Sequence, residues 1–327
     1  MTARRPAATI LAAMVLAALT MTGCTEFPAP DSPPPSATAD IPTPPGAIPQ
    51  TTVEPVPDAG DCDALTSLRP GQLPTPRRMP ARSTMAAIFS RGRLIVGLDI
   101  GSNLFSFRDT ITGDIKGFDV DIARAIARAV FGDPNQIEFR VLTSGDRIKY
   151  LQKGDVDVVV KTMSITCDRR QAVSFSAPYY VAAQRILAQR NSGIADAGDL
   201  AGKRVCAARG VTSIGRLQSI VPTAHITTTS TWADCLVMLQ QGQVDAVSTD
   251  DAILAGLAEQ DPWVRVIGPS LGEENYAVGI AKGHDDLVRF VNGVLDDVRT
   301  SGQWQQMYNR WLSILGPGSP PIPRYQD

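Results

Sequence analysis

The chain has 327 residues, of which 43% are hydrophobic and 20% are charged, and its formal net charge is −2. This profile is typical of a soluble protein with two domains, and it argues against nucleic-acid binding, which requires clustered excess Lys and Arg. The only histidines are His225 and His284, without the paired spacing of zinc hydrolases, so we expect no metal and no cofactor.

The first 23 residues have the pattern of a secretory signal peptide. Arg4 and Arg5 form a basic start, and residues 7–19 form an apolar run that is too short to span a bilayer comfortably. Met21-Thr22-Gly23-Cys24 then resembles a bacterial lipobox, with Met21 in place of the usual Leu. We therefore expect cleavage after residue 23 and a lipid on Cys24 that anchors the protein on the extracytoplasmic face of the cell membrane. An ordinary signal peptide with an incidental Cys is the alternative.

The next segment, residues 24–60, is rich in proline. Residues 25–60 contain 11 of the 25 prolines and no Lys or Arg. Few large apolar residues are present, so no core can offset the entropy of ordering this stretch. Pro-rich chains stay extended and semi-stiff. We expect a stalk that holds the folded region away from the membrane.

Four further cysteines are expected to form disulfides, because an exported chain folds in an oxidising compartment. Four cysteines allow three pairings. Cys206 and Cys235 lie in the same half of the folded region, so we pair them, which leaves Cys62 to pair with Cys167. Free buried thiols are the alternative.

The folded region begins with a strand and a helix. Residues 93–98 form an apolar run that is typical of a buried strand. Apolar residues then recur on one helical face, which predicts an amphipathic helix over 117–130. They are Ile122, Ala125, Ile126, Ala129 and Val130.

Two segments of the chain repeat one pattern. Residues 151–160 and 239–248 both read L-Q-x-G-x-V-D-x-V. In each, we expect a helix that ends at the Leu-Gln pair, a left-handed Gly and a short buried strand. Thr231 and Asp234 are placed to cap the helix of the second copy. Such junctions are common in α/β proteins, but the shared pattern favours two similar α/β domains.

Other elements complete the folded region. They are a strand over 203–207, a helix start at 210–213, and closing helices over 287–295 and 303–315. In open α/β sheets, ligands bind beyond the carboxyl ends of the strands. The expected site positions are therefore Asp99, the loop after Val160, the turn at Gly210 and the loop after Val247.

The start of the predicted helix over 117–130 also resembles a family signature. Gly117-Phe118-Asp119-Val120-Asp121-Ile122, followed by Ile126-Ala127 and Val130, resembles the signature of the family 3 extracellular solute-binding proteins. Residues 164–180, 210–213 and 244–250 resemble ligand-binding segments of that family, in the same order and spacing. The resemblance extends from about Arg91 to Leu315.

This resemblance implies an α/β fold with two lobes, a periplasmic-binding-protein-like clamp of type II joined by two hinge strands. Lobe 1 would comprise residues 85–182 plus 274–315, and lobe 2 would comprise 183–273. Residues 61–84 would pack on lobe 1, and residues 316–327 would form a tail. The ligand would be buried as the lobes close.

The family also implies a set of residues that bind a free amino acid. Arg169 would hold the α-carboxylate in a bidentate fork, which Lys cannot reproduce. Backbone N–H groups and hydroxyls of Ser164 and Thr212 would complete the shell of that carboxylate. Asp250 would pair with the α-ammonium, and the carbonyl of Thr162 would be a second acceptor. Surface charges and ordinary turn residues are the alternatives at these positions.

Basic residues near this site indicate which ligand side chain the protein prefers. Residues 143–148 resemble a segment of acidic-amino-acid binders in which an Arg, here Arg147, reaches the distal carboxylate. Lys161 and Arg209 are further candidates, with solvated surface charges as the alternative. A buried ligand carboxylate requires a paired cation, so spare basic groups favour glutamate or aspartate over asparagine or glutamine.

We therefore expect a monomeric lipoprotein, not an enzyme, that binds a free polar amino acid. It would deliver this ligand to the permease and ATPase subunits of an ABC importer. A sensor subunit that signals to a membrane protein needs the same clamp and remains an alternative. A cyclohexadienyl dehydratase-like enzyme is another alternative, with Asp99 as its acid.

Overall fold

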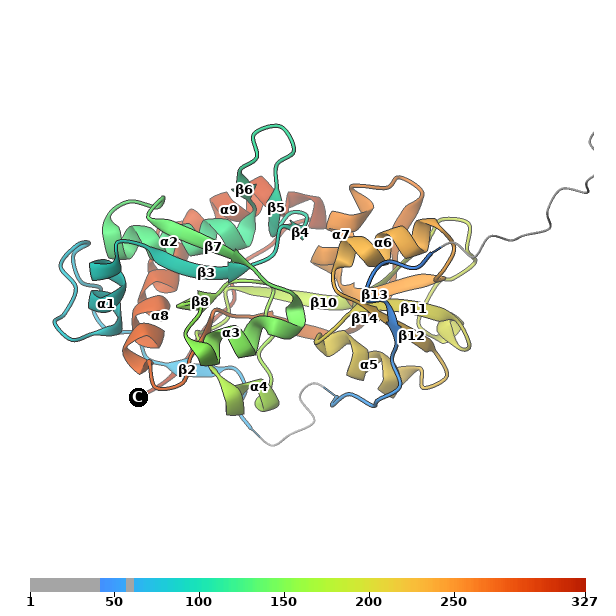
Figure 1. Cartoon of the computed structure of the whole chain (residues 1–327), viewed down its shortest axis with the longest axis horizontal. Helices are drawn as coiled ribbons and strands as arrows, with labels where there is room; N and C mark the ends of the chain where they lie inside the picture. Colours follow the sequence, from blue (N-terminus) through green and yellow to red (C-terminus); the bar gives the residue numbers. More distant parts are fainter. Residues whose placement is uncertain (1–41, 57–61) are drawn as a thin grey trace, which may run out of the picture. The chain divides into compact units, whose positions relative to one another are not determined.

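The computed structural model describes residues 42–56 and 62–327. The expected signal peptide, Cys24 and the first part of the expected stalk lie outside these residues. Within the described ranges, no helix is both long enough and apolar enough to cross a membrane. The described chain forms two lobes, each built around a mixed sheet with its own hydrophobic core (Figure 1).

Lobe 1 contains a five-stranded sheet in the order β7–β3–β8–β15–β9. The strands β3, β7 and β8 are parallel to one another, and β15 runs antiparallel to both of its neighbours. The bounds are β3 Leu94–Leu98, β7 Ile137–Val141, β8 Val158–Val159, β9 Ser174–Phe175 and β15 Gly279–Ile280.

Helices pack around the lobe 1 sheet. They are α1 Thr84–Arg91, α2 Phe118–Phe131, α3 Arg147–Lys153, α4 Cys167–Ala172, α8 Asp285–Thr300 and α9 Gln303–Trp311. The expected helix over 117–130 is therefore confirmed as α2. Its residues Ile122, Ile126 and Val130 are fully buried, because the apolar side chains recur on one face of the helix.

Lobe 2 contains a six-stranded sheet in the order β1–β12–β11–β13–β10–β14. The bounds are β1 Ile48–Pro49, β10 Tyr180–Gln189, β11 Arg204–Ala208, β12 His225–Thr229, β13 Ala246–Asp250 and β14 Val264–Tyr276. The main helices are α5 Thr212–Ile220, α6 Trp232–Gln240 and α7 Asp251–Ala258. The long strands β10 and β14 pair from Tyr180–Tyr276 to Gln189–Val264, and they join lobe 2 to lobe 1 (Figure 1).

Both copies of the sequence repeat adopt the expected structure. The helices α3 and α6 each lead into a Gly with a left-handed backbone, Gly154 (φ +69°) and Gly242 (φ +67°). The buried strands β8 and β13 follow these turns. Thr231 and Asp234 form a reciprocal capping box at the start of α6, as predicted.

Two terminal segments differ from their predictions. Residues 42–56 were expected to be part of an extended stalk, but β1 pairs with the edge strand β12 of lobe 2. This pairing needs no apolar core of its own, because the edge strand supplies backbone partners, and Pro49 is tolerated at such an edge. The expected tail ends in β16 (Arg324–Gln326), which pairs in parallel with β2 (Thr66–Leu68).

Both expected disulfides are present. Cys62 is bonded to Cys167 at the start of α4, with a Cα–Cα distance of 5.9 Å. Cys206 on β11 is bonded to Cys235 on α6, with a Cα–Cα distance of 5.5 Å. The first bond fixes the segment after residue 61 to lobe 1, and the second fixes α6 to the lobe 2 sheet.

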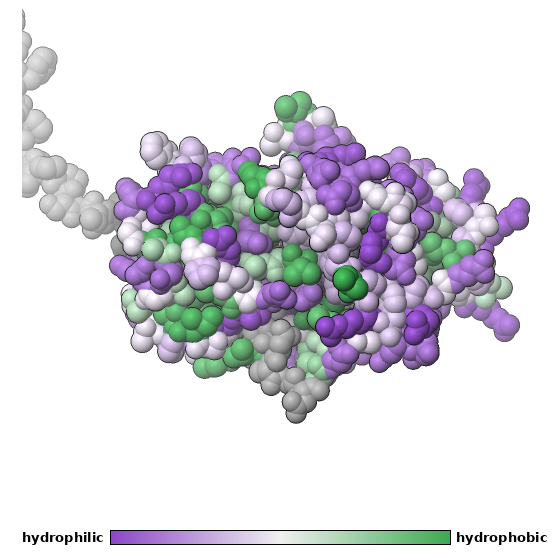
Figure 2. Space-filling view, turned by 180° about the vertical axis from the view of Figure 1, so that it is seen from behind, coloured by the Kyte–Doolittle hydropathy of each residue, from purple (hydrophilic) through white to green (hydrophobic). Residues whose placement is uncertain are grey.

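A small hairpin projects from lobe 1. It is part of a three-stranded sheet of β4 (Gly101–Ser102), β5 (Ser106–Arg108) and β6 (Ile115–Lys116). The tip between β5 and β6 is hydrophobic in Figure 2, and Ile111 is 93% exposed there.

Candidate functional site

A small cavity, with a free volume of about 10 Å³, lies between the lobes. This is space for about one water molecule, so the lobes must separate for an amino acid to enter. Lobe 1 contributes Ser144, Arg147, Thr162, Ser164 and Arg169, and lobe 2 contributes Val211, Thr212, Ser213, Trp232, Thr249, Asp250 and Ile253. Six of the seven predicted ligand-binding residues line this cavity, and Lys161 does not.

Arg169 lies near the start of α4 and reaches across to lobe 2. The side chain of Thr166 caps the helix by accepting a hydrogen bond from the Arg169 backbone N–H at 3.2 Å. The guanidinium donates to the carbonyl of Ser164 at 2.7 Å and to the carbonyl of Gly210 at 3.1 Å. A charged, planar donor group is therefore fixed at the junction of the lobes.

Arg147, the first residue of α3, is held by four backbone carbonyls. Its Nε donates to Ser144 at 2.7 Å, and its Nη1 donates to Lys161 and Thr162 at 3.2 Å each. Its Nη2 donates to Gly210 at 3.2 Å, so both guanidiniums share that acceptor. Burial lowers the pKa of Arg147 to about 9, and the charge of Arg169 adds to this effect.

Neither guanidinium forms an ion pair with a carboxylate in the part of the chain that the structure describes. Arg147, which is buried, and Arg169, which is half-buried, thus face the cavity with carbonyl dipoles as their direct partners. Such charges are costly to bury unless an anion pairs with them. The arrangement can bind an anionic group.

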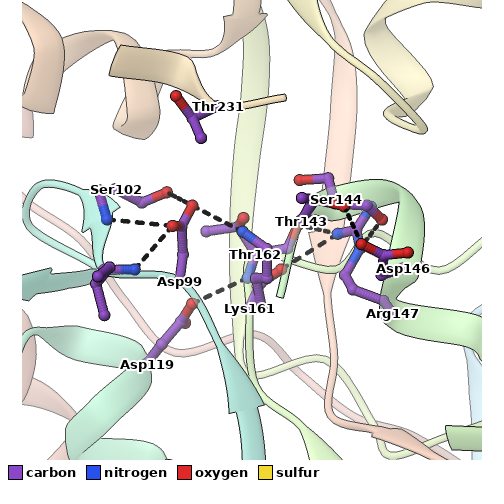
Figure 3. Close-up of polar contacts among 12 residues, drawn as sticks. Asp99, Ser102, Asp119, Thr143, Ser144, Asp146, Arg147, Lys161, Thr162 and Thr231 are labelled. Carbon is purple, nitrogen blue, oxygen red and sulfur yellow. Dashed lines mark hydrogen bonds and ion pairs between the residues drawn. The ribbon is translucent and has the colours of Figure 1, made fainter. Parts of the chain in front are cut away.

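Lys161 was predicted to face the ligand, but its side chain is only 1% exposed and points to Asp99. The Nζ–Oδ2 distance is 2.7 Å, and Ser102 donates a second hydrogen bond to this carboxylate (Figure 3). Burial alone would raise the pKa of Asp99, but the charge and hydrogen bond of Lys161 outweigh it and lower the pKa. The prediction for Lys161 is wrong because an internal carboxylate neutralises the ammonium.

Arg209, the third basic candidate, does not line the cavity. It donates to the carbonyl of Gly46 at 2.7 Å, on the segment that precedes β1. Arg147 is therefore the one basic side-chain candidate of the three that lines the cavity.

Thr162 occupies an unusual backbone conformation beside Arg147. Its φ of +37° is strained for a β-branched residue, and its N–H donates to Asp119 Oδ2 at 2.9 Å (Figure 3). Asp119 also accepts a hydrogen bond from the Tyr179 hydroxyl at 2.7 Å, and burial raises its pKa to about 7. Asp119 belongs to the family signature over residues 117–130, and in the structure it positions the loop that lines the cavity.

The carbonyl of Thr162 was predicted to accept the ligand's ammonium. In this structure it accepts a hydrogen bond from Arg147, and its second lone pair stays available to an ammonium. Asp250, at the end of β13, provides a charged acceptor for a cationic group.

Asp250 presents one free carboxylate oxygen to the cavity. Its Oδ2 accepts a short hydrogen bond from the Tyr276 hydroxyl, whereas its buried Oδ1 has no hydrogen-bond partner in the structure. Burial, followed by the nearby charge of Glu274, raises the pKa of Asp250 well above its usual value. Asp251 does not line the cavity, because its Oδ1 accepts from the N–H groups of Ala183 and Ala252. The choice of Asp250 over Asp251 thus agrees with the geometry.

The start of α5 supplies backbone donors. Val211 is the N-cap residue and makes no side-chain capping hydrogen bond, so the first turn lacks the usual internal acceptor. Thr212 and Ser213 of this turn line the cavity, where such N–H groups favour an anion. The Thr212 hydroxyl itself donates to Glu274 at 3.0 Å, and Glu274 pairs with Arg216 at 3.1 Å.

Trp232 is a cavity residue that the sequence interpretation missed. It is the first residue of α6, is 2% exposed and lines the cavity from lobe 2. The capping box and the Cys206–Cys235 disulfide fix the helix on which it lies. A signal was present, because Trp232 directly follows a strand-to-helix turn at the carboxyl end of a strand.

Together these groups suit a small zwitterion. Donors from Arg169 and from the first turn of α5 can hold a carboxylate, while Asp250 Oδ1 can accept from an ammonium. Arg147 offers a second positive charge nearby. In comparison with known proteins, residues 94–314 match the model of the bacterial extracellular solute-binding proteins, family 3.

The chain belongs to this family.

Two relatives and one solved structure illustrate the similarity. The chain is 33% identical to the ABC transporter glutamine-binding protein GlnH of Bacillus subtilis, over 71% of this chain and 85% of that protein. It is 38% identical to a glutamine-binding protein of Geobacillus stearothermophilus, over 61% and 77%. The crystal structure of the ancestral amino acid-binding protein AncCDT-1, a precursor of cyclohexadienyl dehydratase, matches at 32% identity with a TM-score of 0.64, over 70% and 99%.

Proposed function

We propose that this family 3 protein binds free glutamate or aspartate by lobe closure and delivers it to an ABC importer, with asparagine and glutamine as weaker ligands. The amino-acid-binding relatives support the class of ligand and the transport role. We also propose that Cys24 carries a lipid that anchors a monomeric mature chain on the extracytoplasmic face. The lipobox-like residues 21–24 support this anchor.

The charge balance of the cavity carries the acidic preference. Arg147 and Arg169 contribute two positive charges, and Asp250, ionised when it pairs with the ligand ammonium, contributes one negative charge. Glu274 is paired with Arg216 and adds no net charge. One positive charge is left over, which glutamate or aspartate, with a net charge of −1, would neutralise. Glutamine or asparagine would leave this positive charge without an anionic partner. A buried unpaired charge costs several kcal/mol, and water that still contacts the charge lowers this cost.

In this arrangement each of the three charged groups of glutamate or aspartate would contact its own protein residues. Arg169 and the N–H groups at Thr212 and Ser213 would hold the α-carboxylate. Asp250 Oδ1 would accept from the α-ammonium, and Arg147 would face the distal carboxylate. Trp232 would pack against the apolar atoms of the ligand.

Calorimetry of the mature protein with each of the twenty amino acids tests this proposal. We expect tight binding of glutamate and aspartate and weaker binding of their amides. Binding of none of the twenty would refute the proposed function, and glutamine binding far more tightly than glutamate would refute the acidic preference.

Arg147→Met should convert the specificity of the site. Met fills a similar volume but carries no charge, so the distal carboxylate of glutamate would be buried without a partner. Such an unpaired charge costs about 3 kcal/mol, which corresponds to a loss of glutamate affinity of about 100-fold. The affinity for glutamine should fall less than tenfold. Calorimetry with both ligands checks this, after circular dichroism has shown that the variant is folded. Equal losses for both ligands would show that Arg147 does not select the side chain.

Ligand binding should release a proton from Asp250. Burial raises the pKa of Asp250 in this structure, whereas the ligand ammonium favours the ionised carboxylate and lowers that pKa. Affinity should fall as the pH drops through that raised pKa, by at most tenfold per pH unit. Calorimetry at pH 5 and pH 8, in two buffers with different ionisation enthalpies, measures the proton count. Proton uptake, or the same affinity at both pH values, would contradict this role.

A dehydratase activity gains no support from Asp99. The ion pair with Lys161 lowers its pKa, so the carboxyl group is ionised at neutral pH and is a poor proton donor. Binding followed by transport therefore accounts for the site better than an acid-catalysed elimination.

A further inference from the structure

Residues 42–56 are part of lobe 2, although they precede the residues 94–314 that match the family. Their strand β1 pairs with β12, and the N–H of Gln50 continues this pairing by donating to the carbonyl of Ile226 at 2.8 Å. Ala47 packs against the lobe 2 core. The segment then runs beside α5 (Figure 1). Lobe 2 therefore contains a segment that the family match does not include.

The carbonyl of Gly46 holds a turn that contacts both cavity arginines. It accepts a hydrogen bond from Arg209 Nη2 at 2.7 Å. Arg209 directly precedes Gly210 in the turn after β11. The Gly210 carbonyl in turn accepts from the guanidiniums of Arg147 and Arg169, at 3.2 and 3.1 Å. The segment and the two arginines of lobe 1 therefore hold the same turn of lobe 2.

Gly46 also lies against the turn that leads into α6. A Cβ atom added at Gly46 would be only 3.3 Å from the Oγ atom of Ser230. Two residues after Ser230, Trp232 begins α6 and lines the cavity. One residue of the segment thus lies beside two of the turns from which lobe 2 reaches the cavity.

The other end of the segment contacts α5, whose first turn lines the cavity. The side-chain amide of Gln218 donates to the carbonyl of Thr52 and accepts from the N–H of Glu54, each at 2.9 Å. A Cβ atom added at Gly215 would lie 2.1 Å from the carbonyl oxygen of Pro55, so the segment passes α5 as closely as a glycine permits. Hydrogen bonds and close packing therefore both join the segment to α5.

We propose that residues 42–56 position the lobe 2 half of the ligand site. None of residues 42–56 lines the cavity, so they act through the two turns and the helix that they contact. Without the segment, these elements would be less ordered before the ligand arrives, and ordering them on binding would reduce the affinity. The effect on affinity rests on the proposed function, whereas the effect on the order of the turns does not.

Deletion of residues 42–56 from the mature chain tests this proposal. We expect the glutamate affinity, measured by calorimetry, to fall about tenfold, which is equivalent to ordering one or two further side chains on binding. The matched control deletes residues 320–327. This removes another short strand, β16, whose partner strand β2 does not line the cavity. The control should bind glutamate about as tightly as the unmodified chain.

Amide hydrogen exchange of the unliganded protein distinguishes positioning from a general loss of stability. In the deletion variant, we expect faster exchange at residues 209–214, which form the turn after β11 and the start of α5. Exchange in β10 of the same sheet should stay unchanged. A general loss of lobe 2 stability would instead speed exchange at both places.

Gln218→Ala keeps the whole chain and removes the two hydrogen bonds that Gln218 makes to the segment. It should lose less glutamate affinity than the deletion variant and exchange faster at residues 212–214, and it decides the question if the deleted chain does not fold. If the folded variants match the control in affinity and in exchange, the proposal is wrong. If the unmodified chain binds no amino acid, the proposed function fails, and exchange at residues 209–214 alone decides whether the segment positions these elements.

Discussion

Arg169→Ala should abolish measurable binding of every amino acid ligand. The guanidinium reaches the cavity from α4 and already contacts both lobes through Ser164 and Gly210. Its removal would leave the α-carboxylate of any amino acid without its main partner. The loss of a buried, charge-assisted pair is about 3–5 kcal/mol, which weakens binding more than 100-fold. Calorimetry with glutamate and with glutamine should therefore show the same loss.

Two further variants show whether the loss of binding is specific to the guanidinium of Arg169. Arg169→Lys keeps the charge but offers no planar fork, so it should recover only part of the affinity. Arg140→Ala removes an arginine of β7 that pairs with Glu138 outside the cavity, and it should bind like the unmodified protein. Strong glutamate binding by Arg169→Ala would contradict the assigned role.

Gly210→Ala should prevent the lobes from closing fully. A Cβ atom at this position would lie 2.6 Å from Cα and 3.0 Å from the backbone nitrogen of Gly145 on lobe 1. Any shift also lengthens the hydrogen bonds from Arg147 and Arg169 to the Gly210 carbonyl. Losing two charge-assisted hydrogen bonds costs about 3 kcal/mol or more, so glutamate affinity should fall about 100-fold. X-ray scattering should show little compaction when ligand is added.

Gly242→Ala is the control that distinguishes the steric clash at Gly210 from the strain of placing alanine at a positive φ. Gly242 has a similar left-handed φ, +67° against +77° for Gly210, but an added Cβ would meet nothing within 4 Å. Both variants should lose a similar amount of stability in urea, whereas only Gly210→Ala should lose binding. Equal affinities of the two variants would show that the approach of Gly210 to Gly145 is not needed for closure.

The local elements could be predicted because their patterns are complete within short windows. The helix expected over 117–130 is Phe118–Phe131, and the strand expected over 93–98 is Leu94–Leu98. Apolar periodicity and capping residues are sufficient for such elements. The two-residue strand β1 could not be predicted, because its partner strand β12 lies about 180 residues away in the chain.

The sequence was sufficient to predict a site residue where the residue type alone determines its role. It was not sufficient where the role depends on a contact with a residue distant in the chain. Arg169 and Asp250 line the cavity as the family resemblance implied. Lys161 was a further basic candidate in the sequence, but a carboxylate 62 residues away pairs with it. The role of Asp119 in holding Thr162 depends on a contact between α2 and the loop after β8, which no local pattern encodes.

The central claim is that the cavity binds the α-carboxylate and the α-ammonium of a free amino acid together. Calorimetric titration with L-glutamate, N-acetyl-L-glutamate and glutarate measures this most directly. Asp250 Oδ1 would lose its charged partner in both analogues, because N-acetyl-L-glutamate offers only a neutral amide N–H and glutarate offers no donor, so we expect both to bind at least 100-fold more weakly than glutamate. Equal binding of glutamate and glutarate would contradict the account.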